Sequence, residues 1–407
     1  MNATSLWPIL PGAVLGAALG VAATAALALA EEPFPPPDPL SAADDSRPMF
    51  EEVVRKQRGR DQTLRGRVLV EAASGDLLLQ ADDGLLWILP GGEVESRTQL
   101  DEPFTPVTQD EMGERLLAEM PPGFRIHTTP HYVVCYNTSR TYAQWTSSLL
   151  ERLYKAFTNY WKNQGLELHE PEFPLTVLVF AERQTYDKLS RDDLPGGPGS
   201  IVGYYSLRSN RINMFDLSGA EAVRAPANRR GSMREINQML SQPAAVPLVA
   251  TIVHEATHQI AFNCGLQTRY ADIPLWLCEG MAVYFEAPDL SSTRGWRGIG
   301  RVNYQRLNTF RGNLGQWHDG SLLALVADDR RFRDPRSAAN AYADAWALNY
   351  YLIKYEPDAY LAYLKMLAEK PPLADDGPAA RLAEFHDHFG DPRRLQREFL
   401  KQMARVK

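Results

Sequence analysis

Two histidines and a glutamate lie together in the segment His254-Glu255-Ala256-Thr257-His258. Residues four apart project from the same face of a helix, so both imidazoles can bind one metal ion. Glu255 lies beside them, within reach of a water molecule bound to that ion. A metal-bound water loses its proton far more readily than bulk water, and a neighbouring carboxylate can accept that proton as a general base. The pattern predicts metal-assisted hydrolysis, and its simpler alternative is a pair of surface or core histidines.

A third protein ligand is expected, because catalytic zinc generally takes three and leaves its fourth position open. Pro274 begins a second apolar segment of helical character, in which Glu279 follows His258 by 21 residues. A return helix after a connection of this length can lie against the first helix, so Glu279 is the natural carboxylate ligand. We therefore predict one Zn²⁺ per chain, held by His254, His258 and Glu279.

The pairing of these two segments resembles the gluzincin metallopeptidases, the peptidase MA-like clan. The resemblance is carried by HEATH at residues 254–258 and by WLCEGMAVYFE at residues 276–286. Over about residues 124–400 the chain is similar to a group of uncharacterised exported peptidases of this clan, with a domain of unknown function. The resemblance implies that Glu279 is the third zinc ligand and that the substrate is a peptide or protein. The chain departs from thermolysin-like relatives at Val283, where they carry an Asp beside the metal ligands.

Tyr342 is the candidate that would stabilise the oxyanion of a peptide carbonyl under attack. It lies in AYADAWAL at residues 341–348, which looks like a segment of those exported peptidases, and it follows Glu279 by 63 residues. That interval resembles the spacing of the corresponding tyrosine in aminopeptidase-like relatives. A phenol donor aimed at the oxygen strengthens its hydrogen bond as negative charge grows. The alternative is a packing role, since Tyr342 shares its helical segment with Trp346 and Tyr350.

The N-terminal segment indicates export. Residues 7–30 carry no charge and end in Ala28-Leu29-Ala30, a small-x-small pattern that signal peptidases accept. Residues 1–5 lack Lys and Arg, and an uncharged run of this length can also span a bilayer. Residues 1–30 are therefore a cleaved signal peptide or a retained membrane anchor, and the protein is expected outside the cytoplasm, in the periplasm, cell envelope or medium. Residues 31–50 are rich in proline and predict a linker.

The remaining chain predicts an α+β fold. Short apolar runs separated by Gly-containing turns indicate a small β domain at residues 51–105. Residues 120–407 are expected to form the peptidase-like domain, with an α/β lobe at 120–216 and a helical lobe carrying the zinc site at 245–407. Residues 202–215 predict a hairpin whose second strand, ending at Phe215, is the edge that binds an extended peptide.

The composition limits the possible partners. The chain has 407 residues and a formal net charge of −7, without the basic stripe typical of nucleic-acid binders. Of the three cysteines, Cys264 and Cys278 would form a disulfide between the two ligand segments or remain buried thiols. Nothing in the sequence specifies an oligomeric state. The competing function is a catalytically silent, metal-binding envelope protein that binds a protein partner, although a general base next to the ligands favours an enzyme.

Overall fold

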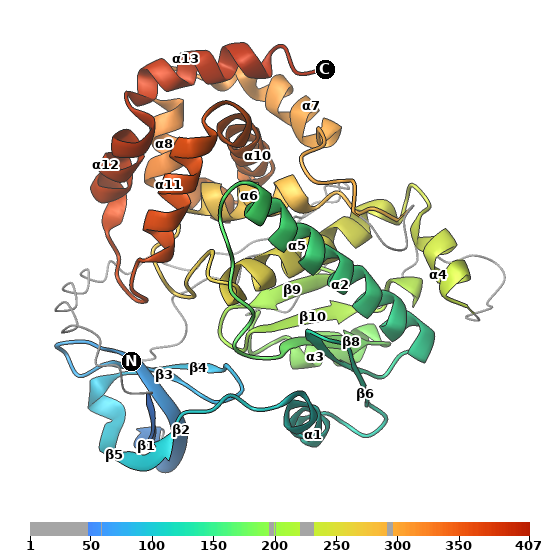
Figure 1. Cartoon of the computed structure of the whole chain (residues 1–407), viewed down its shortest axis with the longest axis vertical. Coiled ribbons are helices and arrows are strands. Elements are labelled where there is room, and N and C mark those ends of the chain that lie inside the picture. Colours follow the sequence, from blue (N-terminus) through green and yellow to red (C-terminus); the bar gives the residue numbers. More distant parts are fainter. Residues whose placement is uncertain (1–47, 58, 195–198, 200, 220–231, 291–295) are drawn as a thin grey trace.

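The computed structural model describes residues 48–57, 59–194, 199, 201–219, 232–290 and 296–407 (Figure 1). The fold is α+β, as the sequence predicts: strands dominate up to Phe215, and helices dominate from there to the C-terminus. The predicted signal or anchor at residues 1–30 and most of the predicted linker lie outside the described residues. Among the helices of the described part, none is long and apolar enough to cross a membrane.

The first sheet has five strands in the order β4-β3-β2-β1-β5. Its small core consists of side chains that alternate along the strands, with Val53, Leu64 and Leu79 among its buried members. The outer strand β5 is almost entirely exposed, which explains why its sequence carries little hydrophobic signal. The five strands are β1 (Met49–Gln57), β2 (Arg60–Glu71), β3 (Leu77–Gln80), β4 (Leu86–Leu89) and β5 (Val94–Pro103).

The second sheet has the order β6-β7-β8-β10-β9, with β7, β8 and β10 parallel and the two outer strands antiparallel to their neighbours. Strand β10 pairs with β8 on one side and β9 on the other, so the prediction that it forms a free edge is wrong. On this side of the sheet the edge strand is β9, because the hairpin folds back on the side of β10 away from β8. The strands are β6 (Arg125–Thr128), β7 (Tyr132–Tyr136), β8 (Leu175–Phe180), β9 (Gly203–Ser206) and β10 (Arg211–Phe215).

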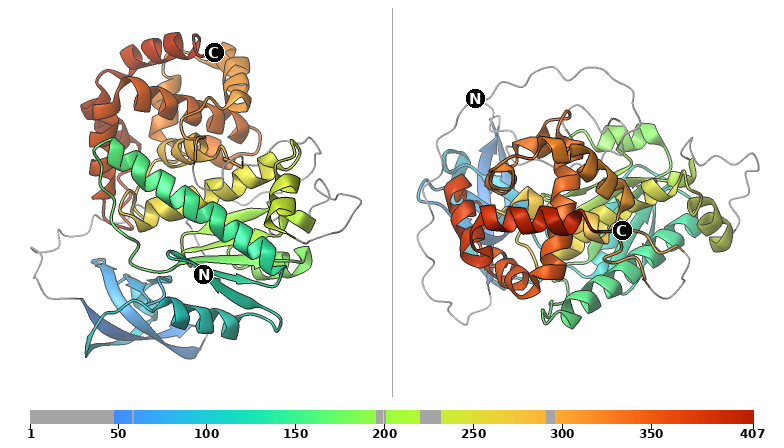
Figure 2. Two further views of the ribbon diagram at one scale, coloured as in Figure 1. Left: turned by 45° about the vertical axis from the view of Figure 1, so that its right-hand side comes forward. Right: turned by 90° about the horizontal axis from the view of Figure 1, so that it is seen from above.

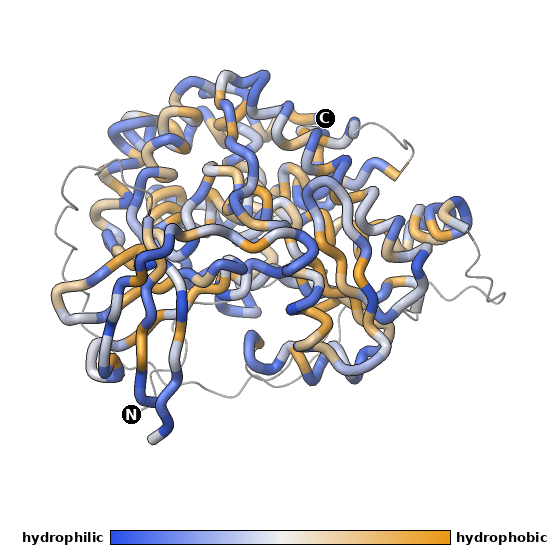
Figure 3. The backbone as a smooth tube through the Cα atoms, turned by 60° about the horizontal axis from the view of Figure 1, so that its bottom comes forward, coloured by the Kyte–Doolittle hydropathy of each residue, from blue (hydrophilic) through white to orange (hydrophobic). Residues whose placement is uncertain are grey.

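Helices cover both faces of this second sheet. Alternate residues of β7 show the division: Val134 joins the core beneath α2 (Arg140–Asn163) and α5 (Val246–Asn263), whereas Val133 joins the cluster beneath α1 (Gln109–Glu119) and α3 (Arg183–Leu189). The interior is accordingly hydrophobic along its strands and helices, with hydrophilic turns at the periphery (Figure 3). This alternation fixes which face of the sheet α5 covers.

Helices α6 to α13 form a layer on the far side of α5 from the second sheet, whereas α4 packs against α2 (Figure 2). Within it, α6 packs between α5 and α10, and α7 lies beside α10. The helices after α3 that have not yet been given are α4 (Met233–Leu240), α6 (Leu275–Phe285), α7 (Tyr304–Asn313), α8 (Ser321–Ala327), α9 (Arg330–Arg333), α10 (Ala338–Tyr355), α11 (Pro357–Ala368), α12 (Gly377–Phe389) and α13 (Pro392–Met403).

The connection between α5 and α6 also holds the first sheet in place. Arg269 is buried there and donates to two backbone carbonyls, Leu207 at the end of β9 (3.0 Å) and Gly84 in the β3–β4 turn (2.9 Å). Its neighbour Tyr270 packs with Leu78 and other buried side chains of the first sheet. The first sheet therefore docks directly on the loop that joins the two helices of the candidate metal site.

Candidate metal centre

Helix α5 carries the two histidines. Pro247 occupies its first turn, where a missing N–H costs nothing, and the helix ends before Gly265, whose positive φ of 81° reverses the chain. His254 and His258 are fully buried, as is Glu255 between them. The helix is thus enclosed by protein around its metal-binding segment, which fixes the direction of both imidazoles.

Helix α6 brings Glu279 against them. Pro274 precedes its first turn, and the backbone N–H of Leu275 donates to Asp329 Oδ1 at 3.0 Å, which anchors the start of the helix. A Cβ on Gly280 would lie 2.7 Å from the carbonyl carbon of Ala345 on α10 and closer still to its oxygen. Only glycine therefore permits α6 to approach α10 at the residue that follows Glu279.

The three predicted ligands meet. The Nε2 atom of His254 lies 3.0 Å from Glu279 Oε2 and 3.2 Å from His258 Nε2, and His258 Nε2 lies 3.6 Å from Glu279 Oε2. Two ligand atoms of a tetrahedral zinc ion, at metal distances near 2.1 Å, are about 3.4 Å apart. The triangle therefore has the dimensions that zinc requires, and among the described residues this is the one cluster of ligating side chains that fits a metal ion.

A residue that the sequence analysis missed supports His254. Its Nδ1 atom lies 3.2 Å from Oε2 of Glu286, which terminates α6, while Oε1 of Glu286 accepts a hydrogen bond from Asn303 Nδ2 at 2.8 Å. Ligand histidines usually have such a partner, and it sets the tautomer that leaves Nε2 to the metal. The signal was present, because Glu286 follows Glu279 by seven residues and so shares its helix face.

A thiol supports His258. Cys278 Sγ lies 3.4 Å from His258 Nδ1 and also 3.4 Å from Gln267 Oε1. All three cysteines are buried free thiols, so of the two alternatives for Cys264 and Cys278 the structure has the unbridged one. Burial raises the pKa of Cys278 well above its usual range, which keeps it a neutral thiol. The two imidazoles therefore have different supports, a carboxylate behind His254 and a thiol behind His258.

Glu255 is anchored through one of its two carboxylate oxygens. Its Oε2 atom accepts a hydrogen bond from the backbone N–H of Tyr205, on edge strand β9, at 2.8 Å. Its Oε1 atom is buried and has no hydrogen-bond partner in the described part of the chain. Burial raises the pKa of Glu255 to about 8. A carboxylate with one anchored oxygen and one unoccupied oxygen is arranged to take a proton from a molecule placed beside it.

The charges of the centre favour a divalent cation. Burial lowers the pKa of His254, but hydrogen bonds to Glu279 and Glu286 outweigh burial and raise it to about 10. Burial raises the pKa of Glu279, yet the two histidines bring it down to about 2. When Glu255, Glu279 and Glu286 are ionised, the guanidinium of Arg306 beside Glu286 leaves an excess of two negative charges. A bound dication would balance that excess, and it would replace the proton that His254 otherwise takes.

Tyr342 lies next to the ligands. Its ring centroid is 6.4 Å from that of His254 and 5.5 Å from that of Phe332, in an edge-on packing. Burial, followed by the negative charges of Glu279 and Glu255, raises the pKa of Tyr342 well above its usual range. The phenol therefore stays protonated and can act as a donor, while Phe332 fixes the plane of its ring.

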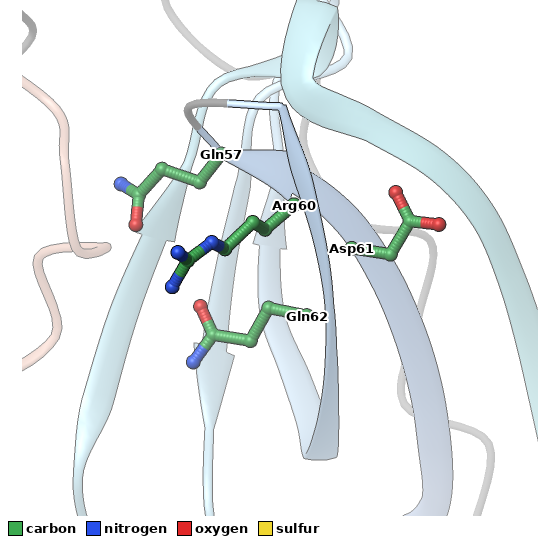
Figure 4. A pocket seen from close by; sticks show the side chains of 4 residues that line it. All are labelled: Gln57, Arg60, Asp61 and Gln62. Carbon is green, nitrogen blue, oxygen red and sulfur yellow. The ribbon is translucent and has the colours of Figure 1, made fainter.

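A second feature of the structure is a surface hollow at the tip of the β1–β2 hairpin. Figure 4 shows the four polar side chains that line it, Gln57, Arg60, Asp61 and Gln62. All four belong to the first sheet, and none is a residue of the buried centre. It holds no group that the chemistry predicted from the sequence requires.

A comparison with protein families gives one match. Residues 248–374 match a family described as a protein of unknown function, DUF1570. The matched segment contains both histidines, Glu279 and Tyr342, and it agrees with the expected similarity to a domain of unknown function. A search of curated proteins gave no match.

Proposed function

We propose that this chain is an exported zinc metallopeptidase of the gluzincin type, acting on peptides or proteins. The observation that carries the proposal is the triangle of His254, His258 and Glu279, with the unpartnered Oε1 atom of Glu255 beside it. Zinc in this site would polarise the substrate carbonyl and acidify a water molecule. The donor set of two imidazoles and one carboxylate is one that catalytic zinc uses.

The residues of the chain divide the remaining work. Glu255 accepts the proton of the attacking water at Oε1, while the Tyr205 N–H holds Oε2 still. The Tyr342 hydroxyl donates to the carbonyl oxygen as its negative charge grows. Glu286 and Cys278 hold the ring planes of His254 and His258. Strand β9 replaces β10 as the edge on which an extended peptide would lie.

One observation favours the competing function. All three ligand residues and Glu255 have 0% of their surface exposed, which suits a closed metal site that stabilises a partner-binding protein. In a peptidase the same closure requires a motion that admits the substrate. Under both proposed functions we expect the protein to be exported, with residues 1–30 either cleaved or retained as an anchor.

The substitution Glu255→Gln separates the two functions. It keeps the shape of the side chain and the three ligands but removes the carboxylate that accepts the proton. Zinc content should stay the same, and hydrolysis of a broad peptide library should fall by about 10²- to 10⁴-fold. Glu114→Gln, at an exposed position of α1, is the matched control and should retain full activity. Cleavage that persists unchanged in Glu255→Gln would identify a contaminating protease, and zinc-loaded wild type without cleavage would favour the partner-binding protein.

A further inference from the structure

Arg306, in the first turn of α7, is a buried cation whose guanidinium has no hydrogen-bonding partner among the residues that the structure describes. Only 10% of its side chain is exposed. Its Nε atom lies 3.9 Å from Glu286 Oε1, which is an ion-pair distance but too long for a hydrogen bond. The guanidinium carbon also lies 5.6 Å from the centre of the Tyr342 ring.

Other arginines with little exposed side-chain surface have acceptors within the chain. Arg381 binds the carboxylates of Asp272 and Asp329, Arg211 binds Glu119, and Arg269 donates to two backbone carbonyls. A guanidinium has five N–H donors, each of which forms a hydrogen bond to an acceptor or to water. Arg306 departs from this pattern, so an acceptor from outside the chain is the natural complement.

Glu286 does not accept a hydrogen bond from the guanidinium, because the 3.9 Å between Arg306 Nε and Glu286 Oε1 is too long. Its Oε1 atom already accepts from Asn303 at 2.8 Å, and its Oε2 atom lies 3.2 Å from His254 Nδ1. Asn303 also accepts from the backbone N–H of Arg306, which fixes the start of α7 at this distance from Glu286. The guanidinium is therefore held near the Glu286 carboxylate without forming a hydrogen bond to it.

The position of Arg306 relates it to the proposed reaction. Arg306 and His254 contact opposite oxygens of the same carboxylate, so they lie within roughly 10 Å, about three extended residues. Its guanidinium also lies over Tyr342, the proposed oxyanion donor. A peptide whose carbonyl reached the metal triangle could place an anionic group against Arg306 within that span.

We propose that Arg306 binds a carboxylate of the substrate, one to three residues from the cleaved bond. The preferred substrates are then peptides with a free C-terminal carboxylate, or with Asp or Glu, near that bond. A carboxylate is favoured because the planar fork of a guanidinium matches its two oxygens, and a single arginine matches a single negative charge. This inference rests on the proposed function and specifies its substrate class.

The test measures binding and needs no turnover. Zinc-loaded Glu255→Gln protein is mixed with a degenerate library of N-acetylated hexapeptides with free C-termini, and separately with the same library amidated. Retained peptides are identified by mass spectrometry after ultrafiltration. We expect carboxylate-bearing peptides to be retained about 10- to 100-fold over their neutral counterparts, as for charge-assisted hydrogen bonds. A bias confined to free C-termini identifies the terminal carboxylate, and enrichment of Asp or Glu in the amidated library identifies the side chain.

The bias should disappear when Arg306→Gln is added to Glu255→Gln. Arg301→Gln, which removes an exposed charge five residues earlier, should preserve it. Equal loss in both variants would show that the bias comes from the overall electrostatic attraction between protein and peptide, and it would overturn the inference. Loss of zinc from Arg306→Gln would overturn it in favour of a role in holding Glu286. Retention of peptides without any bias would overturn it and leave the proposed peptidase standing, whereas retention of no peptide at all would count against both.

Discussion

Charged side chains are exposed in the first sheet but enclosed in the layer formed by α5, α6 and α10. In the first sheet, Arg65 and Glu102 pair at 2.5 Å with 47% and 56% of their side chains exposed, an arrangement that contributes little to stability. In the helical layer, Glu255 and Glu279 are completely enclosed. Enclosed carboxylates cost free energy unless a cation or a hydrogen bond compensates them. This contrast is what we expect if the enclosed charges of the layer serve a metal site rather than stability.

The sharpest way to test this contrast is to remove one enclosed charge. Glu279→Ala should abolish tight zinc binding, because two histidines alone leave an open and weak site. Wild type should gain about 4 kcal/mol of unfolding free energy in zinc at 1,000 times its dissociation constant, and the variant almost none. Metal analysis and urea denaturation with and without zinc measure both effects. Glu102→Ala in the first sheet is the control, and bound zinc in Glu279→Ala would place the third ligand elsewhere.

A pair of glycines extends the comparison to packing. Gly280→Ala should lower the free energy of unfolding by about 1–3 kcal/mol, because its new methyl group would overlap the Ala345 carbonyl. Gly92→Ala in the first sheet, where a Cβ meets no atom within 4 Å, should change it by less than about 0.5 kcal/mol. Thermal or urea denaturation of the metal-free proteins compares them. Equal effects would show that α6 and α10 can separate at no cost.

The two histidine supports allow a finer test. Glu286→Gln and Cys278→Ala should each weaken zinc binding by about 10- to 100-fold, as expected when the partner of a ligand histidine is lost. The loss should be greater for Glu286→Gln, since it removes a negative charge beside His254. Competition with a chromogenic chelator gives the affinities. The control is Glu95→Gln, at a surface ion pair of the first sheet, which should leave the zinc affinity unchanged. Unaltered zinc affinity in Glu286→Gln would contradict the proposed role of Glu286 in supporting His254.

A partly buried ion pair in the α/β lobe lies between these extremes. His131 Nδ1 is 2.8 Å from Glu151 Oε2. The hydrogen bond to Glu151 raises the pKa of His131. Burial raises the pKa of Glu151, but the hydrogen bonds from His131 outweigh it and lower that pKa.

Linkage then defines the pH window of this pair. The raised pKa of His131 gives stability that is complete below its unfolded pKa and is lost as pH rises through the folded value. The lowered pKa of Glu151 gives stability that is lost as pH falls through its folded value. His131→Gln should therefore cost on the order of 1 kcal/mol near pH 5.5 and less near pH 8.5. Urea denaturation at both pH values measures this difference, and a cost that grows with pH would contradict the assignment.

The sequence predicted those parts of the molecule that local spacing determines. His254, His258 and Glu279 could be chosen because helix periodicity and metal chemistry act over short distances. Glu286 was missed because the carboxylate partner of His254 was sought at Val283, four residues after Glu279. A helix also returns to the same face after seven residues, which is where Glu286 lies. Arg306 could not be foreseen, since it reaches Glu286 only through the packing of α7 beside α10.

The strands show the same limit. Strand β5 is polar and exposed, so its residues resemble a loop, and its pairing with β1 depends on the rest of the sheet. The hairpin of β9 and β10 was predicted from its turn, but which of its strands forms the edge depends on pairing with β8. Long-range pairing of this kind leaves no mark in a local pattern.

The hydrogen bond from Arg269 to Gly84 joins residues 185 positions apart. During synthesis at about 5–20 residues per second, roughly ten to forty seconds separate the emergence of the two groups. The docking face of the first sheet must therefore wait, with Leu78 and Leu86 uncovered, until Tyr270 arrives. The joint that closes over these leucines is thus among the late contacts of folding, and the interval before it forms is when the nascent chain is most exposed to aggregation.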